Sequence, residues 1–380
     1  AKKALSIDTY DPAANFYDGL INLKLGREAD ARDGFGIASM SVEYRSAAFL
    51  ELARICFHRK DYEQAMDYTR KSLIWNQQNM DALRLQAMIF RMEHDEASAM
   101  EILEKILKLD PLSHFAGFER YLWHDADADA FKAGIKNELP SETYLDLGIW
   151  YYNLGLMDET KKVFAFAPAT PEINYWKAFL EDKPVVSQDP DTANAFPYRA
   201  ETAEILESLI RKNSDWHLKY QLALIWWSRN QAEKAAALFS ACGNEPDYAP
   251  FYAAKAVLFP ADQEADLQKA RALDKDQWRY PKLLSEYYIR NEAFSKALAV
   301  VEPFYTAHSS NYVLGMLYAR LLLLTGQYPA ADALLTRLNI IPFEGATDGR
   351  RLYHEAKLMQ AVAQIKKGRY KKALLFIQAA

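Results

Sequence analysis

Small and hydrophobic residues recur along this chain with the spacing of packed amphipathic helices, and the small ones come in pairs twelve positions apart. The clearest pairs are Gly19/Ala31, Ala53/Ala65, Ala87/Ala99, Gly148/Thr160, Ala223/Ala235, Ser285/Ala297, Ala319/Ala331 and Ala361/Ala373. A polar turn lies between the two members of each pair. Two antiparallel helices joined by a short turn touch where both carry small side chains. The pattern therefore predicts a series of antiparallel helix pairs.

The pairs recur at a fixed distance. Ala31, Ala65 and Ala99 are 34 residues apart, as are Ala297 and Ala331. The longer steps between residues 99, 160, 235 and 297 each leave room for one degenerate pair, and Ala253/Ala265 is the candidate for the last of them. A single pair cannot bury its apolar face alone, so neighbouring pairs must stack. We expect an all-α array of about eleven pairs over residues 1–380.

The best copy of the repeat has Tyr144, Leu147, Gly148 and Tyr151 in its first helix and Phe164 in its second. These residues resemble the tetratricopeptide-repeat (TPR) family, whose pattern is W-x2-L-G-x2-Y followed by A-x3-F at a period of 34. The resemblance implies a TPR-type α-solenoid, in which the pairs wind into a right-handed superhelix.

The repeat divides the chain into regular and degenerate units. Regular units are expected at about 12–111, 141–170, 216–247 and 278–380, and degenerate ones at about 112–140, 171–215 and 248–277. Long loops at 181–198 and 339–349 interrupt the array. Loops of this length often carry function in repeat proteins, so both are of interest.

The two ends of the chain both match the inside of a second helix. Residues 3–8 resemble residues 105–110, and Ala4 and Ala380 fall at the same repeat position as Ala38. Solenoids normally end in polar capping units, so we expect a piece of a longer chain. Stretches 144–153, 241–250 and 341–346 are similar to the C-terminal TPR array of large bacterial proteins with an N-terminal domain of uncharacterised function. That resemblance implies a scaffold attached to another domain.

Composition excludes several classes of protein. Hydrophobic residues make up 50% and charged residues 26% of the 380, which is globular usage. The net charge of −5 mixes both signs without a basic stripe, so nucleic-acid binding is not expected. No run of about 18 apolar residues predicts a membrane span. Both a cytoplasmic and a periplasmic location stay open.

Candidate chemistry is sparse. No HExxH, phosphate-binding glycine loop or nucleophile elbow occurs in the sequence. One cluster alternates carboxylates as a calcium loop does: His124, Asp125, Asp127 and Asp129. Its sixth and twelfth loop positions are Ala130 and Lys136 instead of Gly and Glu, which favours a solvated turn that caps the next helix. We therefore expect no catalysis, no metal and no cofactor.

In TPR proteins the first helix of each pair lines a concave groove. The resemblance implies groove positions three before and one, four and five after the small residue of that helix. In this chain these positions hold Arg54, Phe57, His58, Arg84, Met88, Arg91, Tyr152, Asn153, Tyr220, Trp227, Arg290 and Arg320. A lining of aromatic, methionine and arginine side chains suits an extended peptide or a partner helix.

Two functions of different classes compete. The leading hypothesis is a non-catalytic scaffold that binds a peptide or protein partner, or its own missing N-terminal domain, in the groove. The alternative is a carbohydrate-binding module of a glycan-processing system, because the chain has 23 Tyr, 19 Phe and 8 Trp and such rings stack on sugars. Most of these rings occupy repeat core positions. Open repeat ends would also allow association between copies.

Overall fold

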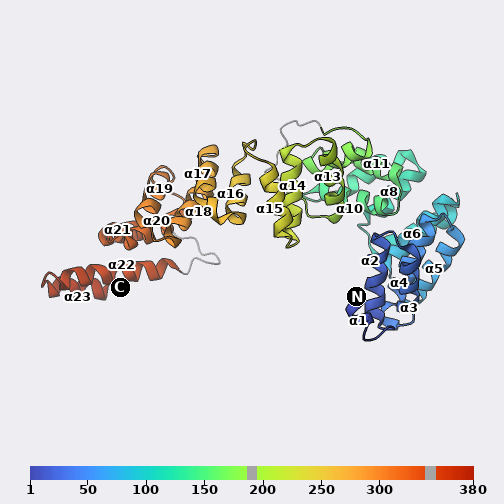
Figure 1. The fold of residues 1–380 in the computed structure, drawn as a ribbon, viewed down its shortest axis with the longest axis horizontal. Coiled ribbons are helices and arrows are strands. Elements are labelled where there is room, and N and C mark those ends of the chain that lie inside the picture. The colour runs from blue at the N-terminus through green and yellow to red at the C-terminus, as the bar shows by residue number, and fades with distance from the viewer. Residues whose placement is uncertain (186–194, 339–347) are drawn as a thin grey trace. The chain divides into compact units, whose positions relative to one another are not determined.

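The computed structural model describes residues 1–185, 195–338 and 348–380, and these residues form helices and turns without a β-strand (Figure 1). The chain divides into two compact units, residues 1–195 and residues 196–380. The all-α prediction is confirmed. The central part of the first predicted loop and most of the second lie outside the described residues.

Unit 1 consists of α1 and five consecutive helix pairs, followed by α12. The helices are α1 Lys2–Leu5, α2 Pro12–Lys24, α3 Glu28–Ala38, α4 Val42–His58, α5 Tyr62–Trp75, α6 Met80–Met92, α7 Glu96–Leu109, α8 His114–Trp123, α9 Ala128–Gly134, α10 Pro140–Asn153, α11 Met157–Phe166 and α12 Pro171–Leu180. A 3-10 turn, η1 Asp125–Asp127, joins α8 to the short α9.

Unit 2 begins with α13 and continues with five pairs. The helices are α13 Ala200–Lys212, α14 Trp216–Ser228, α15 Ala232–Ala241, α16 Ala249–Leu258, α17 Gln263–Leu273, α18 Arg279–Arg290, α19 Phe294–Ala307, α20 Tyr312–Leu324, α21 Tyr328–Arg337, α22 Asp348–Ile365 and α23 Tyr370–Gln378. A 3-10 turn, η3 Pro260–Asp262, precedes α17. The eleventh predicted pair would join α12 to α13, which belong to different units, so the continuity of the array stays a prediction.

Residues twelve positions apart meet in at least two of the pairs, as predicted. The hydroxyl of Thr160 donates a hydrogen bond to the carbonyl of Gly148 at 3.3 Å, and that of Ser285 to the carbonyl of Ala297 at 3.2 Å. A Cβ at Gly148 would lie 2.5 Å from the ring of Phe164, so only glycine permits this approach.

One predicted pair is wrong. Ala253 is half-buried and Ala265 is exposed, whereas the buried alanines of α16 and α17 are Ala249, Ala256 and Ala270. The 3-10 turn between the two helices shifts the register of α17 against α16, so the closest contact moves away from the twelve-residue spacing.

The turn inside each regular pair has one backbone conformation. The residue seven positions after the small residue has a positive φ of 55–76° in all eight pairs: Gly26, Lys60, His94, Gly155, Asn230, Glu292, Gly326 and Gly368. The next residue's amide donates to the carbonyl five residues earlier, as Arg27 does to Asn22 at 2.8 Å and Gln327 to Leu322 at 2.7 Å. This is a Schellman motif, which ends a helix and reverses the chain.

Some first helices pack against one another. Helix α4 contacts both α2 and α6, α8 contacts α10, and α20 contacts α22. That the first helices line a concave inner side stays a prediction. Among the described helices, none is long and apolar enough to cross a bilayer.

Candidate functional site

Several predicted groove residues of unit 1 form ion pairs within the protein itself. Arg54 on α4 binds Glu51 at 2.6 Å and reaches Asp81 of the next first helix at 2.7 Å. Arg84 shares the same Asp81 at a longer 3.3 Å. Arg54, predicted to face a partner, is therefore already bound on both sides, while Arg84 is held loosely.

Arg91 forms the most buried of these ion-pair clusters. Its guanidinium donates to Glu119 of α8 at 2.8 Å and to Glu159 of α11 at 2.9 Å. The hydroxyl of Tyr151 donates to the second oxygen of Glu119 at 2.6 Å. Glu119 is only 1% exposed. Arg91 was expected to contact a partner, but it serves as the counter-charge of a buried carboxylate.

Burial dominates the proton affinities in this cluster. It raises the pKa of Glu119, although the guanidinium of Arg91 opposes the shift. Burial and the neighbouring Glu119 raise the pKa of Tyr151 well above its ordinary value. Burial alone would lower the pKa of Arg91, but the charge of Glu119 and its other neighbours outweigh this and raise it. Arg91 thus stays charged, and the cluster joins α6, α8, α10 and α11.

A second contact links turns that lie far apart in sequence. The Nε2 atom of His58, at the end of α4, lies 3.0 Å from the carbonyl oxygen of Asn153, at the end of α10. Gly155 lies next to this imidazole, and its φ of 76° is a backbone conformation that favours glycine. Tyr152 packs edge-on against Trp176 of α12, with centroids 5.0 Å apart. His58, Tyr152 and Asn153 therefore contact other parts of unit 1.

Three predicted groove residues belong to the core. Phe57, Met88 and Tyr220 are 3%, 0% and 4% exposed. They lie four residues after, one residue after and three residues before a small residue, and neighbouring side chains cover them at each of these positions. A partner could not contact these three side chains, so they are not part of a binding surface.

Unit 2 keeps more of its predicted positions at the surface. Trp227 on α14 is half-buried, with its ring 6.4 Å from that of Phe239 and perpendicular to it. Arg290 and Arg320 are exposed at and near the ends of α18 and α20. Their role in binding stays a prediction.

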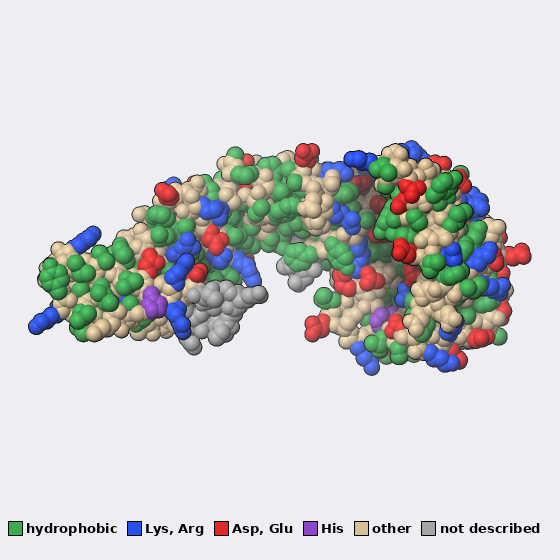
Figure 2. Space-filling model, turned by 90° about the horizontal axis from the view of Figure 1, so that it is seen from below, with side chains coloured by type: hydrophobic (Ala, Val, Ile, Leu, Met, Phe, Trp, Pro, Cys, Tyr) green, Lys and Arg blue, Asp and Glu red, His purple; other side chains and the backbone are tan. Residues whose placement is uncertain are grey.

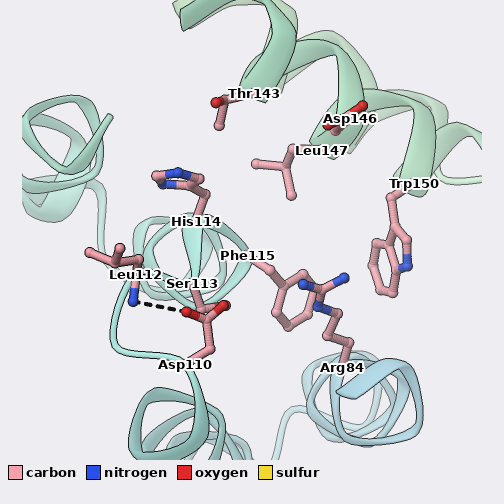
Figure 3. Close-up of a pocket in the computed structure, with 10 residues that line it drawn as sticks. All are labelled: Arg84, Asp110, Leu112, Ser113, His114, Phe115, Thr143, Asp146, Leu147 and Trp150. Carbon is pink, nitrogen blue, oxygen red and sulfur yellow. Dashed lines mark hydrogen bonds between the residues drawn. The ribbon is translucent and has the colours of Figure 1, made fainter. Parts of the chain in front are cut away.

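A hollow of about 210 Å³ opens between the first helices α6, α8 and α10 of unit 1 (Figure 3). It is lined by Arg84, Asp110, Leu112, Ser113, His114, Phe115, Thr143, Asp146, Leu147 and Trp150. Three successive pairs contribute to it. Of the twelve predicted groove residues, only Arg84 lines it.

The floor and one wall of the hollow are aromatic. The rings of Phe115 and Trp150 meet edge-to-face with centroids 4.9 Å apart. The guanidinium carbon of Arg84 lies 5.7 Å from the centre of the Phe115 ring. The Nε of Arg84 is buried without a hydrogen-bond partner. A buried donor left unpaired costs free energy, so this atom favours an incoming acceptor.

His114 lines the hollow at the start of α8. Burial lowers the pKa of His114, against an opposing effect of Asp110. The imidazole is therefore neutral at pH 7. Asp110 accepts a hydrogen bond from the amide of Leu112 at 3.1 Å and so holds the turn before α8.

The histidine of the acidic cluster at residues 124–129 has a partner outside the cluster. His124 contacts Glu96 at 2.9 Å instead of the aspartates. Asp127 stands at the start of α9 but its side chain makes no capping hydrogen bond. No group of three metal-ligating side chains occurs within the described ranges.

Sequence reasoning missed Glu119, Phe115 and Trp150. Phe115 and Glu119 are four apart and therefore on one face of α8, so a carboxylate stood on an apolar face and was the available signal. Trp150, two residues after Gly148, lies outside the groove positions of the family pattern. The short α8–α9 pair brings it beside Phe115.

The stacked antiparallel pairs, the buried small contacts and the shared turn define an all-α protein built from repeated helix pairs. No family model matches the chain, and no curated protein matches it. Three solved structures share 11–13% of its residues. With TM-scores near 0.3, they add nothing to what the helix pairs themselves show.

The structural neighbours are as follows. Yeast Tom70 is 13% identical, with 97% of this chain and 91% of that chain covered and a TM-score of 0.30. A tetratricopeptide repeat protein from Parabacteroides merdae ATCC 43184 is 11% identical over 80% and 92%, with a TM-score of 0.31. A chain in the structure of Naa15/Naa10 bound to HypK-THB is 13% identical, with 96% of this chain and 68% of that chain covered and a TM-score of 0.29. The predicted N-terminal partner domain stays a prediction.

Proposed function

We propose that this protein is a non-catalytic interaction scaffold that holds a segment of a peptide or protein partner on the inner side of its helix pairs. The observation that carries the proposal is the hollow between α6, α8 and α10, which is lined by Arg84, Asp146 and the half-buried ring of Trp150. An attached N-terminal domain is one version of such a partner.

The size of the hollow favours a side chain over a free small molecule. Its volume of about 210 Å³ is below the roughly 300–1,000 Å³ of ordinary small-molecule sites. Protein interfaces, in contrast, commonly rest on a few large side chains that fill small pockets. The hollow therefore suits one anchor residue of a longer segment.

The strongly shifted ionisable groups do not favour an enzyme. Glu119 and Tyr151 have raised pKa values, but Glu119 is 1% exposed and Tyr151 is fully buried. Both side chains bind each other and Arg91 in the core. A substrate has no access to them, so their raised pKa values result from burial and ion pairing in the core.

Photo-crosslinking in the cell tests the proposal. A benzoylphenylalanine placed at Asp146 or Arg320, exposed on first helices, should capture the same partner reproducibly. The matched controls are Glu104 on α7 and Lys269 on α17, exposed on second helices. Equal capture from both pairs of positions, or none from the first pair, would show that the inner side is not the binding face.

Carbohydrate binding is the second candidate, and one exposed ring favours it. Trp75 is 50% exposed, with the guanidinium of Arg45 4.1 Å from its ring centre. A flat, partly open indole beside hydrogen-bond donors is a surface on which a sugar stacks. A glycan array probed with wild-type protein and Trp75→Ala decides the matter, and silence across the panel removes this candidate.

A further inference from the structure

The charges that line the hollow between α6, α8 and α10 restrict the kind of ligand that it can bind. Its lining contains one cation, Arg84, and two carboxylates, Asp110 and Asp146. His114 adds no charge at pH 7, because burial lowers its pKa. The lining therefore carries one net negative charge, which disfavours an anionic ligand despite the arginine.

Arg84 nevertheless has N–H groups that can donate hydrogen bonds to a ligand. Asp81 takes only one of its nitrogens, at 3.3 Å, and binds Arg54 more closely at 2.7 Å. The Nε of Arg84 is buried without a partner. Figure 3 shows the guanidinium above the ring of Phe115, facing the space that Leu147 and Trp150 border. A neutral acceptor oxygen at this place satisfies the donors without adding charge.

The rest of the lining is mainly apolar. The half-buried Trp150 and the exposed Leu112 present apolar surface, with Phe115 and Leu147 packed behind them at 2% and 7% exposure. The oxygens of Ser113 and Thr143 already accept hydrogen bonds from the amide of Ala116 and the side chain of Asn137. Leu112 is 78% exposed at the mouth. An aliphatic or aromatic side chain fits against these groups, and its burial would displace water from them.

We infer that the hollow binds one large apolar side chain of a partner protein, of leucine to phenylalanine size, whose own backbone carbonyl accepts a hydrogen bond from Arg84. This inference deepens the proposed function and rests on it. The group of the partner that contacts Arg84 is then an uncharged backbone carbonyl. It is neither a free carboxyl terminus nor an acidic side chain.

Capped amino acids supply the probes for this site. The protein is labelled with 5-fluorotryptophan, and Trp150→Phe identifies the fluorine resonance of Trp150. N-acetyl-leucine amide, N-acetyl-phenylalanine amide, N-acetyl-alanine amide and the N-acetyl-leucine carboxylate are titrated separately at pH 7.5. Millimolar affinity is expected, because about −4 kcal/mol is reasonable for so small a contact.

The expected result is a saturable shift of the Trp150 resonance with the leucine or phenylalanine amide. The alanine amide should give no shift, and the carboxylate should bind more weakly than its amide. The resonance of Trp75, 50% exposed on α5, is the internal control and should stay fixed. Arg84→Met should weaken the amides at least about threefold, while Arg211→Met on α13 should not.

Three results would overturn the inference. These are an unmoved Trp150 resonance, a preference for the carboxylate, and unchanged amide binding in Arg84→Met. If crosslinking from Asp146 still captures a partner in such a case, the occupant is wrong and the scaffold stands. If crosslinking also fails, the proposed function falls with it.

Discussion

At the scale of single residues, the sequence pattern placed two arginines on first helices but did not identify the carboxylates that they bind. Arg54 and Arg91 lie on first helices, as predicted, and both bind carboxylates of neighbouring helices. The partner of Arg91, Glu119, belongs to the degenerate unit, where the family pattern gives no register. Spacing identifies which face a residue is on, but three-dimensional stacking decides whether that face meets solvent or another helix.

Replacing Arg91 should unfold part of unit 1 before it affects binding. We expect Arg91→Met to cost roughly 3 kcal/mol, because Glu119 would remain buried without its counter-charge. Adding Glu119→Gln should restore part of the loss. Urea unfolding followed by circular dichroism measures both, and a loss under about 1 kcal/mol would contradict the bracing role.

The same variant should respond to pH in a defined direction. The pKa of Glu119 in the folded protein is raised by burial, and loss of Arg91 removes its main opposing influence. A folded pKa above the unfolded one stabilises the protein at low pH, and this contribution is lost as pH rises through the folded value. Arg91→Met should therefore be more stable at pH 5 than at pH 8, by more than wild type is.

The left-handed turn residues offer a test free of packing effects. Gly326 has φ 75°, and a Cβ there would meet nothing within 4 Å. Gly326→Ala should therefore lose about 1 kcal/mol from backbone strain alone. In the matched turn, Glu292→Gly should gain stability, because Glu292 already occupies that conformation at φ 55°. Thermal unfolding compares the two, and shifts of the same sign would contradict the argument.

At the scale of elements, most of the fold could be predicted because the small residues fix where each pair touches. The eight regular pairs have contacts and turns in one register, from Gly19 to Ala373. The pair α16–α17 could not be placed this way, since its 3-10 turn changes the register. The hollow could not be predicted either, since it depends on how the short α8–α9 pair lets α6 and α10 approach.

The contact inside the fifth pair predicts a specific repair. Gly148→Ala should cost about 1–3 kcal/mol, because its Cβ would lie 2.5 Å from the Phe164 ring. Phe164→Leu alone should also destabilise, by leaving a void. The double variant should be more stable than the sum of the two losses implies. Strict additivity, measured by urea unfolding, would mean that these residues do not meet.

At the scale of the whole molecule, each unit has its own set of stacked pairs. Solenoid stability is a sum of local terms, so each unit should fold without the other. We expect residues 1–195 and 196–380, expressed separately, to be helical and to unfold cooperatively. Circular dichroism of both pieces tests this, and a disordered piece would contradict the division.

The last pair of unit 2 exposes apolar side chains. Tyr370, Leu374 and Leu375 on α23 are 70%, 55% and 66% exposed, and Figure 2 shows hydrophobic surface at this end. Surfaces of this kind in a repeat protein are covered by a further unit or by another molecule. Association between copies through this face stays a prediction.

The central claim is that a partner segment occupies the hollow of unit 1. The most direct measurement is the dissociation constant, by calorimetry, of the partner captured from Asp146, for wild type, Arg84→Met and the distant control Arg211→Met. The account predicts binding at least about tenfold weaker for Arg84→Met, equal to a loss of about 1.4 kcal/mol, with wild-type affinity for the control. Equal affinity for all three proteins, each shown to be folded, would contradict it.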